Sequence, residues 1–537
     1  MSRQTKRQSF MSGAAMLAAS VAIVKIIGAV YKIPFGNIVG SEGQTYFNVA
    51  YNIYNMLLTI STAGLPLAIS KLTSQAHAQG RENQKRKIFR ISIWLFFAFG
   101  LAGSVLMFFW AGPLAEFMNE PLGYWPIRAL APAVFCVCLL SCMRGYTQGQ
   151  GDMTPSAVSQ IIEALSKLVL GLSLAWYIVQ RGLGLDLAAA GAIWGVTVGT
   201  VISMFYLIYY LLRHRDRSRA LDVPESGGQL MRQILAIGIP ITVSNSAMSI
   251  ITLVDTKIVL GRLRGIPALA DSAAELFGQY TFGMNLINLP PSFVFPVTAS
   301  LIPFAAAALT RRDHAGASRI ISSGFRLVAV LAIPAGVGLS VLGGPALRML
   351  YPRRQLDAIA AAPHMRCLGI ACIFICIMNL TNAVLQTYGK EHLPIIAVLT
   401  GGVTKVVMNY ALVGNPEINI HGAPVSTLCC YVVIAVMNLI FVWKYSEEKP
   451  RYLQLFLKPV LASLLMGGAA WAVYGFTFRF LSGSHSEYGA NAVAVTAGIL
   501  GGVVVYGVLV VAMRILRAED LRSVPRGAKL AKILRLK

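Results

Sequence analysis

About fourteen long apolar segments run through this chain, and the second half of the series echoes the first. Several polar positions recur at one constant offset, and in each copy a Pro opens the apolar segment that carries the Lys. An internally duplicated membrane protein with many spans is built like a transporter, whose site lies between the halves near the bilayer midplane. The positions at the constant offset are Gln148, Gly151 and Lys167 in the first copy and Gln386, Gly389 and Lys405 in the second, and the two prolines are Pro155 and Pro394.

The apolar segments predict an all-α polytopic membrane protein. Apolar residues make up 56% of the chain and charged residues 13%, and the mean hydropathy is +0.64. A soluble protein needs more charge than this to cover its surface, and a helix needs about 20 apolar residues to cross the bilayer. The predicted spans are 11–35, 45–70, 88–112, 126–147, 156–179, 187–212, 234–260, 275–308, 318–343, 364–388, 393–413, 421–443, 455–480 and 490–514.

The net charge of +24 is distributed over alternate loops. Basic residues gather at the start of the chain, in 81–90 and 213–219, and in later alternate loops, whereas the intervening loops carry mainly Glu and Asp. Only the loop 344–366 departs from this pattern. By the positive-inside rule both termini are cytoplasmic, as an even number of spans requires. The distribution favours membrane topology over nucleic-acid binding.

The N-terminal segment and the cysteines do not suggest processing or metal chemistry. The first apolar run is long, contains Lys25 and Lys32, and has no convincing small-residue cleavage site, so it is expected to be a retained helix. All eight cysteines lie in apolar spans. Cys372 and Cys376 share a helix face, but no His or carboxylate joins them. We therefore expect small packing residues, with no metal site and no cofactor.

The repeat divides the chain into two lobes of six helices and two appended helices. Residues 1–212 form the N-lobe, 213–233 a basic cytoplasmic linker, and 234–444 the C-lobe. Residues 445–537 hold spans thirteen and fourteen and a basic cytoplasmic tail. Because the order is the same in both copies, the lobes are expected to be related by a pseudo-twofold axis along the membrane normal.

Prolines interrupt the second and the eighth spans, at comparable places in the two lobes. An internal Pro removes a backbone hydrogen bond and clashes with the preceding turn, so these helices should be bent or broken. Such breaks mark either a transport site or hinge, or a kink that only serves packing. The positions are Pro66, Pro290, Pro291, Pro296 and Pro303.

Charged residues within the predicted spans are candidates for function, because an ionised group in hydrocarbon costs several kcal/mol unless it faces a partner or water. Glu163 lies four residues before Lys167, a spacing that favours a structural ion pair on one helix. Lys405 occupies the matching place in the second lobe without such an acid. The remaining candidates are Lys25, Lys32, Asp255 and Lys257.

Two arrangements of these residues remain open. A contact between Lys25 and Asp255 would form a gate, although Asp255 could pair elsewhere. Lys32 and Lys257 could extend to the membrane interface instead of facing a cavity. A cavity with several cations suits an anionic ligand such as a phosphate or pyrophosphate.

Asparagines in the second and eighth spans form stripes at spacings of three to four residues. Their amides could hydrogen-bond a sugar, or they could join neighbouring helices, which is common in membranes. The sequence does not separate these alternatives. The residues are Asn48, Asn52, Asn55, Asn285 and Asn288.

Motifs of hydrolytic and metal enzymes are missing from the sequence. It contains no G-x-x-x-x-G-K-[ST] phosphate loop and no H-E-x-x-H. No loop is long enough for a soluble catalytic domain, and no carboxylate cluster on a cytoplasmic loop could hold Mg²⁺. A transporter is therefore favoured over an enzyme.

Four segments resemble the multidrug, oligosaccharidyl-lipid and polysaccharide exporter superfamily, and within it the MurJ and SpoVB group of Gram-positive bacteria. The resemblance covers essentially the whole chain and is more specific for the group than for the cargo. The segments are Lys-Ile-Ile-Gly-Ala-Val-Tyr-Lys-Ile-Pro (25–34), Tyr-Asn-Ile-Tyr-Asn-Met-Leu-Leu (51–58), Ala-Gly-Leu-Pro-Leu-Ala-Ile-Ser-Lys (63–71) and Gln-Gly-Gln-Gly-Asp-Met-Thr-Pro (148–155).

The resemblance implies a flippase that moves an undecaprenyl-pyrophosphate-linked glycan, typically the peptidoglycan precursor lipid II, to the outer leaflet for cell-wall synthesis. The lobes would rock about a central cationic cavity, and the appended helices would form a groove for the lipid tail. The alternative is a small-molecule or drug antiporter of the same superfamily, coupled to Na⁺ or H⁺. It would require a buried carboxylate cluster in the first lobe, which offers only Glu163.

Compared with the group's pattern, the chain keeps one cation and lacks others. Lys25 stands where the Gram-negative branch has a required first-helix Arg, and Tyr31 stands at the second Arg, followed directly by Lys32. Met284-Asn285 stands where the group has Asp-Arg, and Leu58 or Thr59 where it has a second-span Arg. These departures leave the headgroup contacts open, and with them the identity of the glycan.

Overall fold

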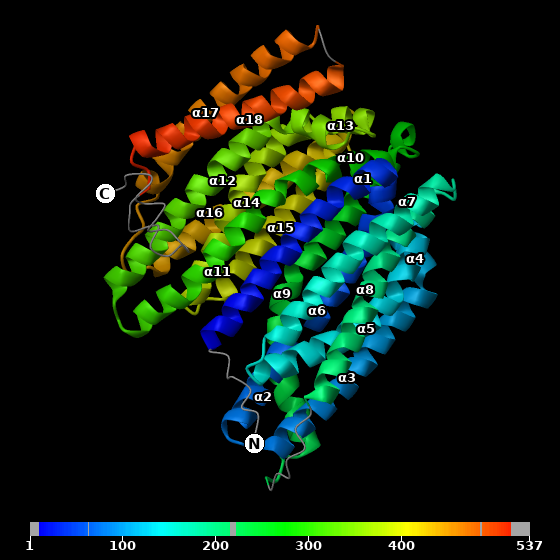
Figure 1. Ribbon diagram of the computed structural model, residues 1–537, viewed down its shortest axis with the longest axis vertical. Helices are drawn as coiled ribbons and strands as arrows, with labels where there is room; N and C mark the ends of the chain where they lie inside the picture. The colour runs from blue at the N-terminus through cyan, green and yellow to red at the C-terminus, as the bar shows by residue number, and fades with distance from the viewer. Residues whose placement is uncertain (1–9, 63, 215–221, 484–485, 517–537) are drawn as a thin grey trace. The chain divides into compact units, whose positions relative to one another are not determined.

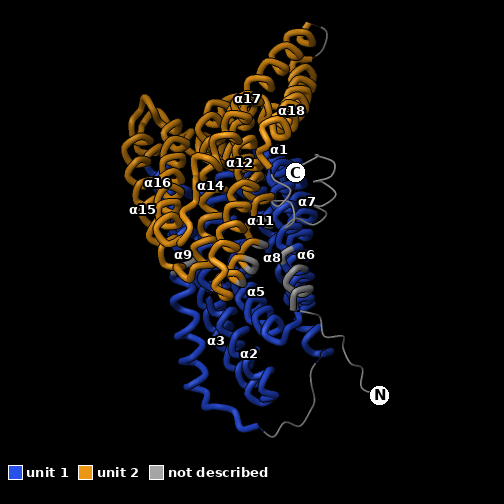
Figure 2. Tube along the Cα trace, turned by 90° about the vertical axis from the view of Figure 1, so that its left-hand side faces the viewer, with its two compact units in different colours: residues 1–261 blue, residues 262–537 orange. Residues whose placement is uncertain are grey.

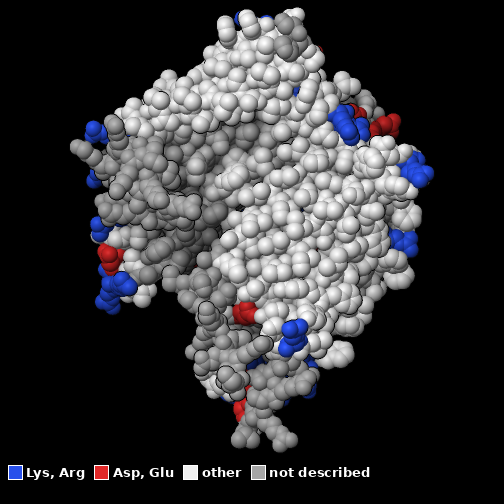
Figure 3. Space-filling view, in the orientation of Figure 1, with Lys and Arg blue, Asp and Glu red and all other residues white. Residues whose placement is uncertain are grey.

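The computed structural model describes residues 10–62, 64–214, 222–483 and 486–516, and these residues are helical with short connections. Among them, eleven helices are long and apolar enough to cross a membrane, or twelve if the bent pair Gly227–Val243 and Ser246–Arg264 forms one span. The surface drawn in Figure 3 has broad areas without Lys, Arg, Asp or Glu, as contact with lipid requires. The all-α membrane fold is confirmed, whereas the count of fourteen spans stays a prediction.

The chain separates into two compact units, residues 1–261 and 262–537, coloured separately in Figure 2. Most of α9 belongs to unit 1, so the boundary between the units falls after the predicted linker 213–233. The helices of unit 1 are α1 (Phe10–Thr62), α2 (Leu65–Ala78), α3 (Glu82–Phe109), α4 (Ala111–Phe117), α5 (Tyr124–Gly149), α6 (Thr154–Ser166), α7 (Leu172–Gln180), α8 (Leu185–Arg213) and α9 (Gly227–Arg264).

Unit 2 contains the remaining helices and the C-terminal pair. Helices α17 and α18 run side by side and both pack on α12 (Figure 1). A hydrogen bond from Asn491 Nδ2 to the carbonyl of Pro345 (3.0 Å) joins α18 to α12. The helices of unit 2 are α10 (Ala273–Ile287), α11 (Leu289–Thr310), α12 (His314–Leu350), α13 (Gln355–Ala361), α14 (His364–Thr387), α15 (His392–Leu412), α16 (Gly422–Tyr445), α17 (Tyr452–Leu481) and α18 (Glu487–Ala512).

The two units share one packing order. In unit 1, α5 packs on α2, α3 and α8, and α6 packs on α8; in unit 2, α14 packs on α11, α12 and α16, and α15 packs on α16. Helices α17 and α18 have no counterpart in unit 1. The shared order supports the internal repeat, while the exact lobe boundaries predicted from the sequence stay a prediction.

The recurring Gln and Gly positions form the same turn in both units. After α5, the amide of Gly151 (φ +82°) donates to the carbonyl of Gln148 at 3.0 Å. After α14, the amide of Gly389 (φ +67°) donates to the carbonyl of Gln386 at 2.9 Å. A positive φ favours Gly, since other residues meet a Cβ penalty there. The sequence repeat thus reflects a conformational requirement at two equivalent helix ends.

The first two predicted spans meet at a kink instead of a loop. Helix α1 continues through Gly40, whose φ of 73° and ψ of −170° interrupt the helical path. The second span then ends at Thr62, and α2 begins at Leu65 with Pro66 in its first turn. Pro suits a first turn because its missing N–H would be unbonded there anyway. Gly64 lies so close to α9 that a Cβ would meet the carbonyl oxygen of Gly238 at 2.0 Å.

The predicted eighth span is divided. Helix α10 ends at Ile287 and α11 begins at Leu289, with Pro290 and Pro291 in its first turn. The side chains of Pro296 and Pro303 lie outside the described residues, although the helix α11 includes both positions.

Candidate functional site

An aromatic cage surrounds the ammonium group of Lys167 inside unit 1. Its Nζ lies 4.7 Å from the ring centroid of Tyr31, 4.4 Å from Tyr51 and 5.5 Å from Phe47. All three rings belong to α1, and Tyr31 and Phe47 are buried. Each such contact stabilises a cation by about 1–2 kcal/mol when water is excluded. The rings therefore stabilise this positive charge within the spans, and the Glu163 carboxylate adds a Coulomb attraction.

The carboxylate of Glu163 pairs with Arg144 of α5. Arg144 Nη2 lies 3.1 Å from Glu163 Oε2, and Arg144 Nε donates to Ser159 Oγ at 2.9 Å. The spacing rule had favoured a pair between Glu163 and Lys167. Lys167 instead contacts the rings of the cage, and it begins a π-helical turn, Lys167–Gly171. Turns of this type often lie at functional sites.

Replacing Arg144 tests this ion pair. In Arg144→Gln the Glu163 carboxylate keeps its charge and loses its partner, and we expect a destabilisation of about 3 kcal/mol. The double variant Arg144→Gln with Glu163→Gln should recover most of this loss, because no buried charge remains. Thermal unfolding of the purified proteins in one detergent measures the difference. Equal unfolding temperatures for the single and double variants would contradict the pairing.

A polar cavity of about 240 Å³ lies between α1 and α9, both in unit 1. Neighbouring hydrogen bonds join the two helices, from Asn52 Nδ2 to Thr256 Oγ1 at 2.8 Å and between the hydroxyls of Thr59 and Ser249 at 2.9 Å. The lining consists of amides and hydroxyls with a single thioether and no charged group: Asn52, Asn55, Thr59, Met248, Ser249 and Thr252. Such a surface can both donate and accept hydrogen bonds.

Buried hydroxyl and amide groups near the cage lack hydrogen-bond partners among the described residues. They include the hydroxyls of Tyr31 and Tyr54 and the Nδ2 atom of Asn48. Both tyrosines are 1% exposed. Buried polar groups are nearly always bonded to protein, water or ligand. The interior of unit 1 therefore has hydrogen-bonding capacity that the protein itself does not use.

The other sequence-predicted residues of unit 1 differ in exposure. Lys25 is exposed, Lys32 is partly buried and Asp255 is buried. The Nζ of Lys257 lies 3.3 Å from the ring centroid of Phe117, and its carbonyl accepts from Asn119 Nδ2 at 3.1 Å. An aromatic ring therefore engages the Lys257 cation. The gate between Lys25 and Asp255 stays a prediction.

Two predicted residues, Asn285 and Lys405, belong to unit 2. Asn285 of α10 is 6% exposed, and Lys405 of α15 is 8% exposed. One turn after Lys405, Asn409 accepts a hydrogen bond from the hydroxyl of Ser426 on α16. Both predicted residues are therefore buried.

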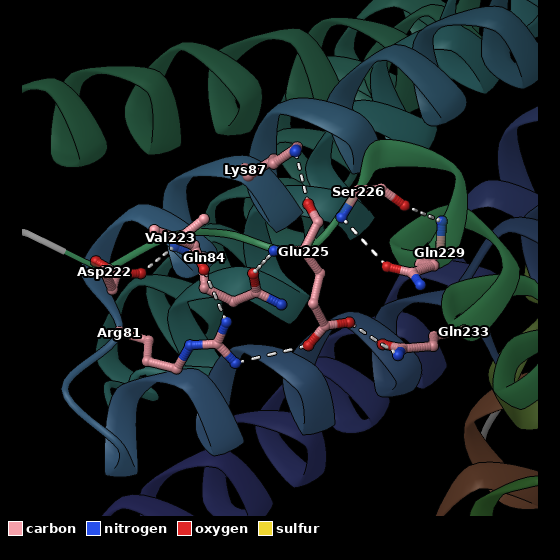
Figure 4. Close-up of polar contacts among 9 residues, drawn as sticks. All are labelled: Arg81, Gln84, Lys87, Asp222, Val223, Glu225, Ser226, Gln229 and Gln233. Atoms are coloured by element: carbon pink, nitrogen blue, oxygen red, sulfur yellow. Dashed lines mark hydrogen bonds and ion pairs between the residues drawn. The ribbon is translucent and has the colours of Figure 1, made fainter.

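The start of α9 is fastened to the turn between α2 and α3 by the network drawn in Figure 4. The carboxylate of Asp222 accepts from the amides of Asn83 and Gln84, both at 2.9 Å, and so caps the start of α3. Glu225 donates its amide to Gln84 Oε1 at 2.7 Å. Lys87 Nζ donates to the Glu225 carbonyl at 2.6 Å. This network fixes where α9 begins, and α9 carries one wall of the polar cavity.

The cap gives a testable pH dependence. Desolvation alone would raise the pKa of Asp222, but the two amide hydrogen bonds and the charge of Arg81 outweigh it and hold the pKa below its ordinary value. Because the pKa is lower in the folded state, the ionised carboxyl stabilises the folded state at pH values above its unfolded-state pKa of about 3.9. That stability is lost as the pH falls through the folded value.

Replacing Asp222 should expose the amides that it caps. We expect several-fold faster hydrogen exchange at Asn83 and Gln84 in Asp222→Ala at pH 7, measured by mass spectrometry and corrected for intrinsic rates. The difference from the unmodified protein should shrink as the pH falls through the lowered folded-state pKa of Asp222, because the protonated carboxyl accepts these hydrogen bonds less well. Asp271→Ala, which removes an exposed carboxylate from a loop, is the matched control. Unchanged exchange in Asp222→Ala would contradict the cap.

The sequence analysis missed several of these residues. Arg144 lies inside the predicted span 126–147, so the search for charges within spans would have found it. The hydroxyls of Ser249 and Thr252 gave no signal, because single hydroxyls are common in membrane helices. Among the described residues, no three His, Cys, Asp or Glu side chains lie close enough together to hold a metal ion.

A twice-repeated bundle of membrane-spanning helices with polar groups in its interior is the architecture of a membrane transporter. The chain belongs to the polysaccharide biosynthesis protein family, whose sequence profile matches residues 10–308. It is 28% identical to the membrane protein YabM of Bacillus subtilis (strain 168), over 99% of this chain and 97% of YabM. It is 24% identical to the lipid II flippase MurJ of the same organism, over 92% of this chain and 94% of MurJ.

Solved structures show the same fold. An inward closed conformation of the lipid II flippase MurJ superimposes with a TM-score of 0.67 at 14% identity, covering 93% of this chain and 99% of that one. An inward-facing multidrug resistance transporter of the MATE family, of the MOP superfamily, gives 0.62 at 15% identity, covering 78% and 97%. The predicted fold is therefore confirmed.

Proposed function

We propose that the protein is a flippase that moves an undecaprenyl-linked cell-wall precursor, lipid II, from the inner to the outer leaflet by alternating access. The observation that carries the proposal is the polar cavity between α1 and α9, about 240 Å³ in volume. Sugar hydroxyls need both donors and acceptors, and the amides of Asn52 and Asn55 with nearby hydroxyls supply both.

The positive charges within the spans support the same cargo. Lys25 and Lys32 lie on α1, the helix that also contributes Asn52 and Asn55. The Lys167 ammonium group packs on rings of this helix. A pyrophosphate carries several negative charges, and ammonium groups bind such anions through charge-assisted hydrogen bonds. The likeness to a lipid II flippase over most of the chain agrees with this cargo.

A second candidate is a small-molecule or drug antiporter coupled to Na⁺ or H⁺. The observation that favours it is the pair of acidic residues within the spans of unit 1, buried Asp255 and largely buried Glu163. A protonatable carboxylate in a membrane span is a common element of ion coupling. Glu163, however, is engaged by Arg144, which favours the flippase.

The sidedness of lipid II in cells tests the proposal. Cells depleted of their own flippase and supplied only with this protein should expose lipid II on the outer surface to an impermeant labelling reagent. Lys25→Ala should block this exposure while the protein remains in the membrane. Lipid II retained inside cells that contain the unmodified protein in the membrane would contradict the proposed cargo.

The orientation of the protein in the plasma membrane is a further part of the proposal. The concentration of basic residues in alternate loops predicts that both termini lie on the cytoplasmic side.

A further inference from the structure

A second cavity, separate from the one between α1 and α9, lies among α3, α5, α7 and α8 of unit 1. Its volume is about 470 Å³. Its lining includes Ile178, Leu187 and Trp194, and Arg128 is its one charged residue. The shape and composition suit an apolar chain with one anionic group.

The guanidinium of Arg128 has no carboxylate partner among the described residues. Its Nη1 donates to the hydroxyl of Tyr124 at 2.6 Å, and its Cζ lies 4.4 Å from the ring centroid of Phe108. Arg128 is partly buried and lies one turn inside the long helix α5. The rings of Phe108, Tyr124 and Trp125 compensate part of the desolvation cost of this cation, and a bound anion would compensate more of it.

Aromatic side chains indicate that this cavity opens at the membrane interface. Trp125, in the first turn of α5, lines it and is 45% exposed. At the nearby end of α3, Phe109 is 73% exposed and Trp110 is 60% exposed. Exposed Trp is typical of the headgroup level of a bilayer. From Leu187 to Trp194 the helix α8 rises about 10 Å, so the cavity extends from this level into the hydrocarbon region.

We propose that this cavity binds one acidic phospholipid. Arg128 holds the headgroup phosphate, and the wall formed by Ile178, Leu187 and Trp194 holds an acyl chain. An acidic lipid is required because the Arg128 charge is not neutralised by the protein, and a zwitterionic lipid carries its own ammonium group. A free phosphate is not the ligand, since it would leave the apolar wall unfilled. The site shares no residue with the proposed transport cavity.

Native mass spectrometry of the full protein, exchanged into equal amounts of phosphatidylglycerol and phosphatidylcholine, tests the proposal. We expect one retained phosphatidylglycerol and at least a fivefold preference over phosphatidylcholine, corresponding to about 1 kcal/mol. Arg128→Gln should abolish this preference. Arg181→Gln should retain it, because Arg181 is an exposed loop cation that packs on Tyr177. The absence of a preference in the unmodified protein, or its survival in Arg128→Gln, would overturn the proposal.

A second variant separates lipid binding from misfolding and from binding of a bare anion. Leu187→Trp fills the apolar wall and leaves Arg128 in place, so it should lower phosphatidylglycerol retention as well. Glycerol phosphate, which has the anion without the chain, should not displace the retained lipid. Full retention in Leu187→Trp, or displacement by glycerol phosphate, would contradict the acyl-chain part of the proposal.

Discussion

The double substitution Asn52→Leu with Asn55→Leu is expected to lower lipid II translocation at least tenfold. Both amides line the polar cavity between α1 and α9. A lost hydrogen bond costs about 1 kcal/mol, and a buried partner left unpaired costs more. Two such losses, together with an apolar surface where sugar hydroxyls should bind, exceed the 1.4 kcal/mol that corresponds to a tenfold change. The rate at which lipid II becomes accessible outside cells measures the effect.

A matched variant distinguishes this loss from a general defect of the membrane protein. Thr400 is exposed on α15, and its hydroxyl donates only to the Ile396 carbonyl of its own helix, at 2.9 Å. Thr400→Val removes one polar group from a span and should leave translocation unchanged. Normal translocation in the double variant, at an equal amount of protein in the membrane, would mean that the cavity does not contact the cargo.

The substitution Gly195→Val is expected to prevent stable packing of α8. A Cβ at Gly195 would meet the Gly171 nitrogen at 2.3 Å and the Gly171 Cα at 2.4 Å. These are backbone atoms of the π-helical turn that begins at Lys167, so no flexible side chain can move aside. Overpacking of this kind costs about 3 kcal/mol. We expect a lower unfolding temperature and less folded protein after purification.

A second glycine provides the control for this prediction. Gly468 lies on α17, and a Cβ there would meet nothing within 4 Å. Gly468→Ala should leave stability unchanged or raise it by up to about 1 kcal/mol, because Ala favours a helix. Equal unfolding temperatures for Gly195→Val and the unmodified protein would contradict the close approach of α8 to Gly171.

Features of the fold that depend on local sequence were predictable. Long apolar runs indicated membrane helices. The recurrence of Gln148 and Gly151 as Gln386 and Gly389 indicated a repeat. In the structure both glycines adopt a positive φ at the end of a helix, which explains why Gly recurs there. Helix breaks near Pro66 and Pro290 also follow from the missing N–H of Pro. The kink at Gly40 was not predicted, since one Gly in a polar segment fits a loop equally well.

Contacts between distant segments could not be predicted from one sequence. The spacing of Glu163 and Lys167 favoured a pair, but Glu163 pairs with Arg144 of α5 and Lys167 packs on aromatic rings. The aromatic residues that surround Lys167 gave only a general apolar signal. The cap that Asp222 places on α3 joins segments about 140 positions apart, and no local pattern specifies such a contact.

Reconstitution with purified components tests the central claim most directly. The protein is placed in liposomes with labelled lipid II in both leaflets, and an impermeant reagent reports the label that reaches the outside. We predict that nearly all lipid II becomes accessible with the unmodified protein, whereas an equally labelled phospholipid does not, and that Asn52→Leu with Asn55→Leu slows the process. A different result would contradict the flippase and support the antiporter: lipid II stays inside, while the same liposomes exchange a small organic cation for Na⁺ or H⁺.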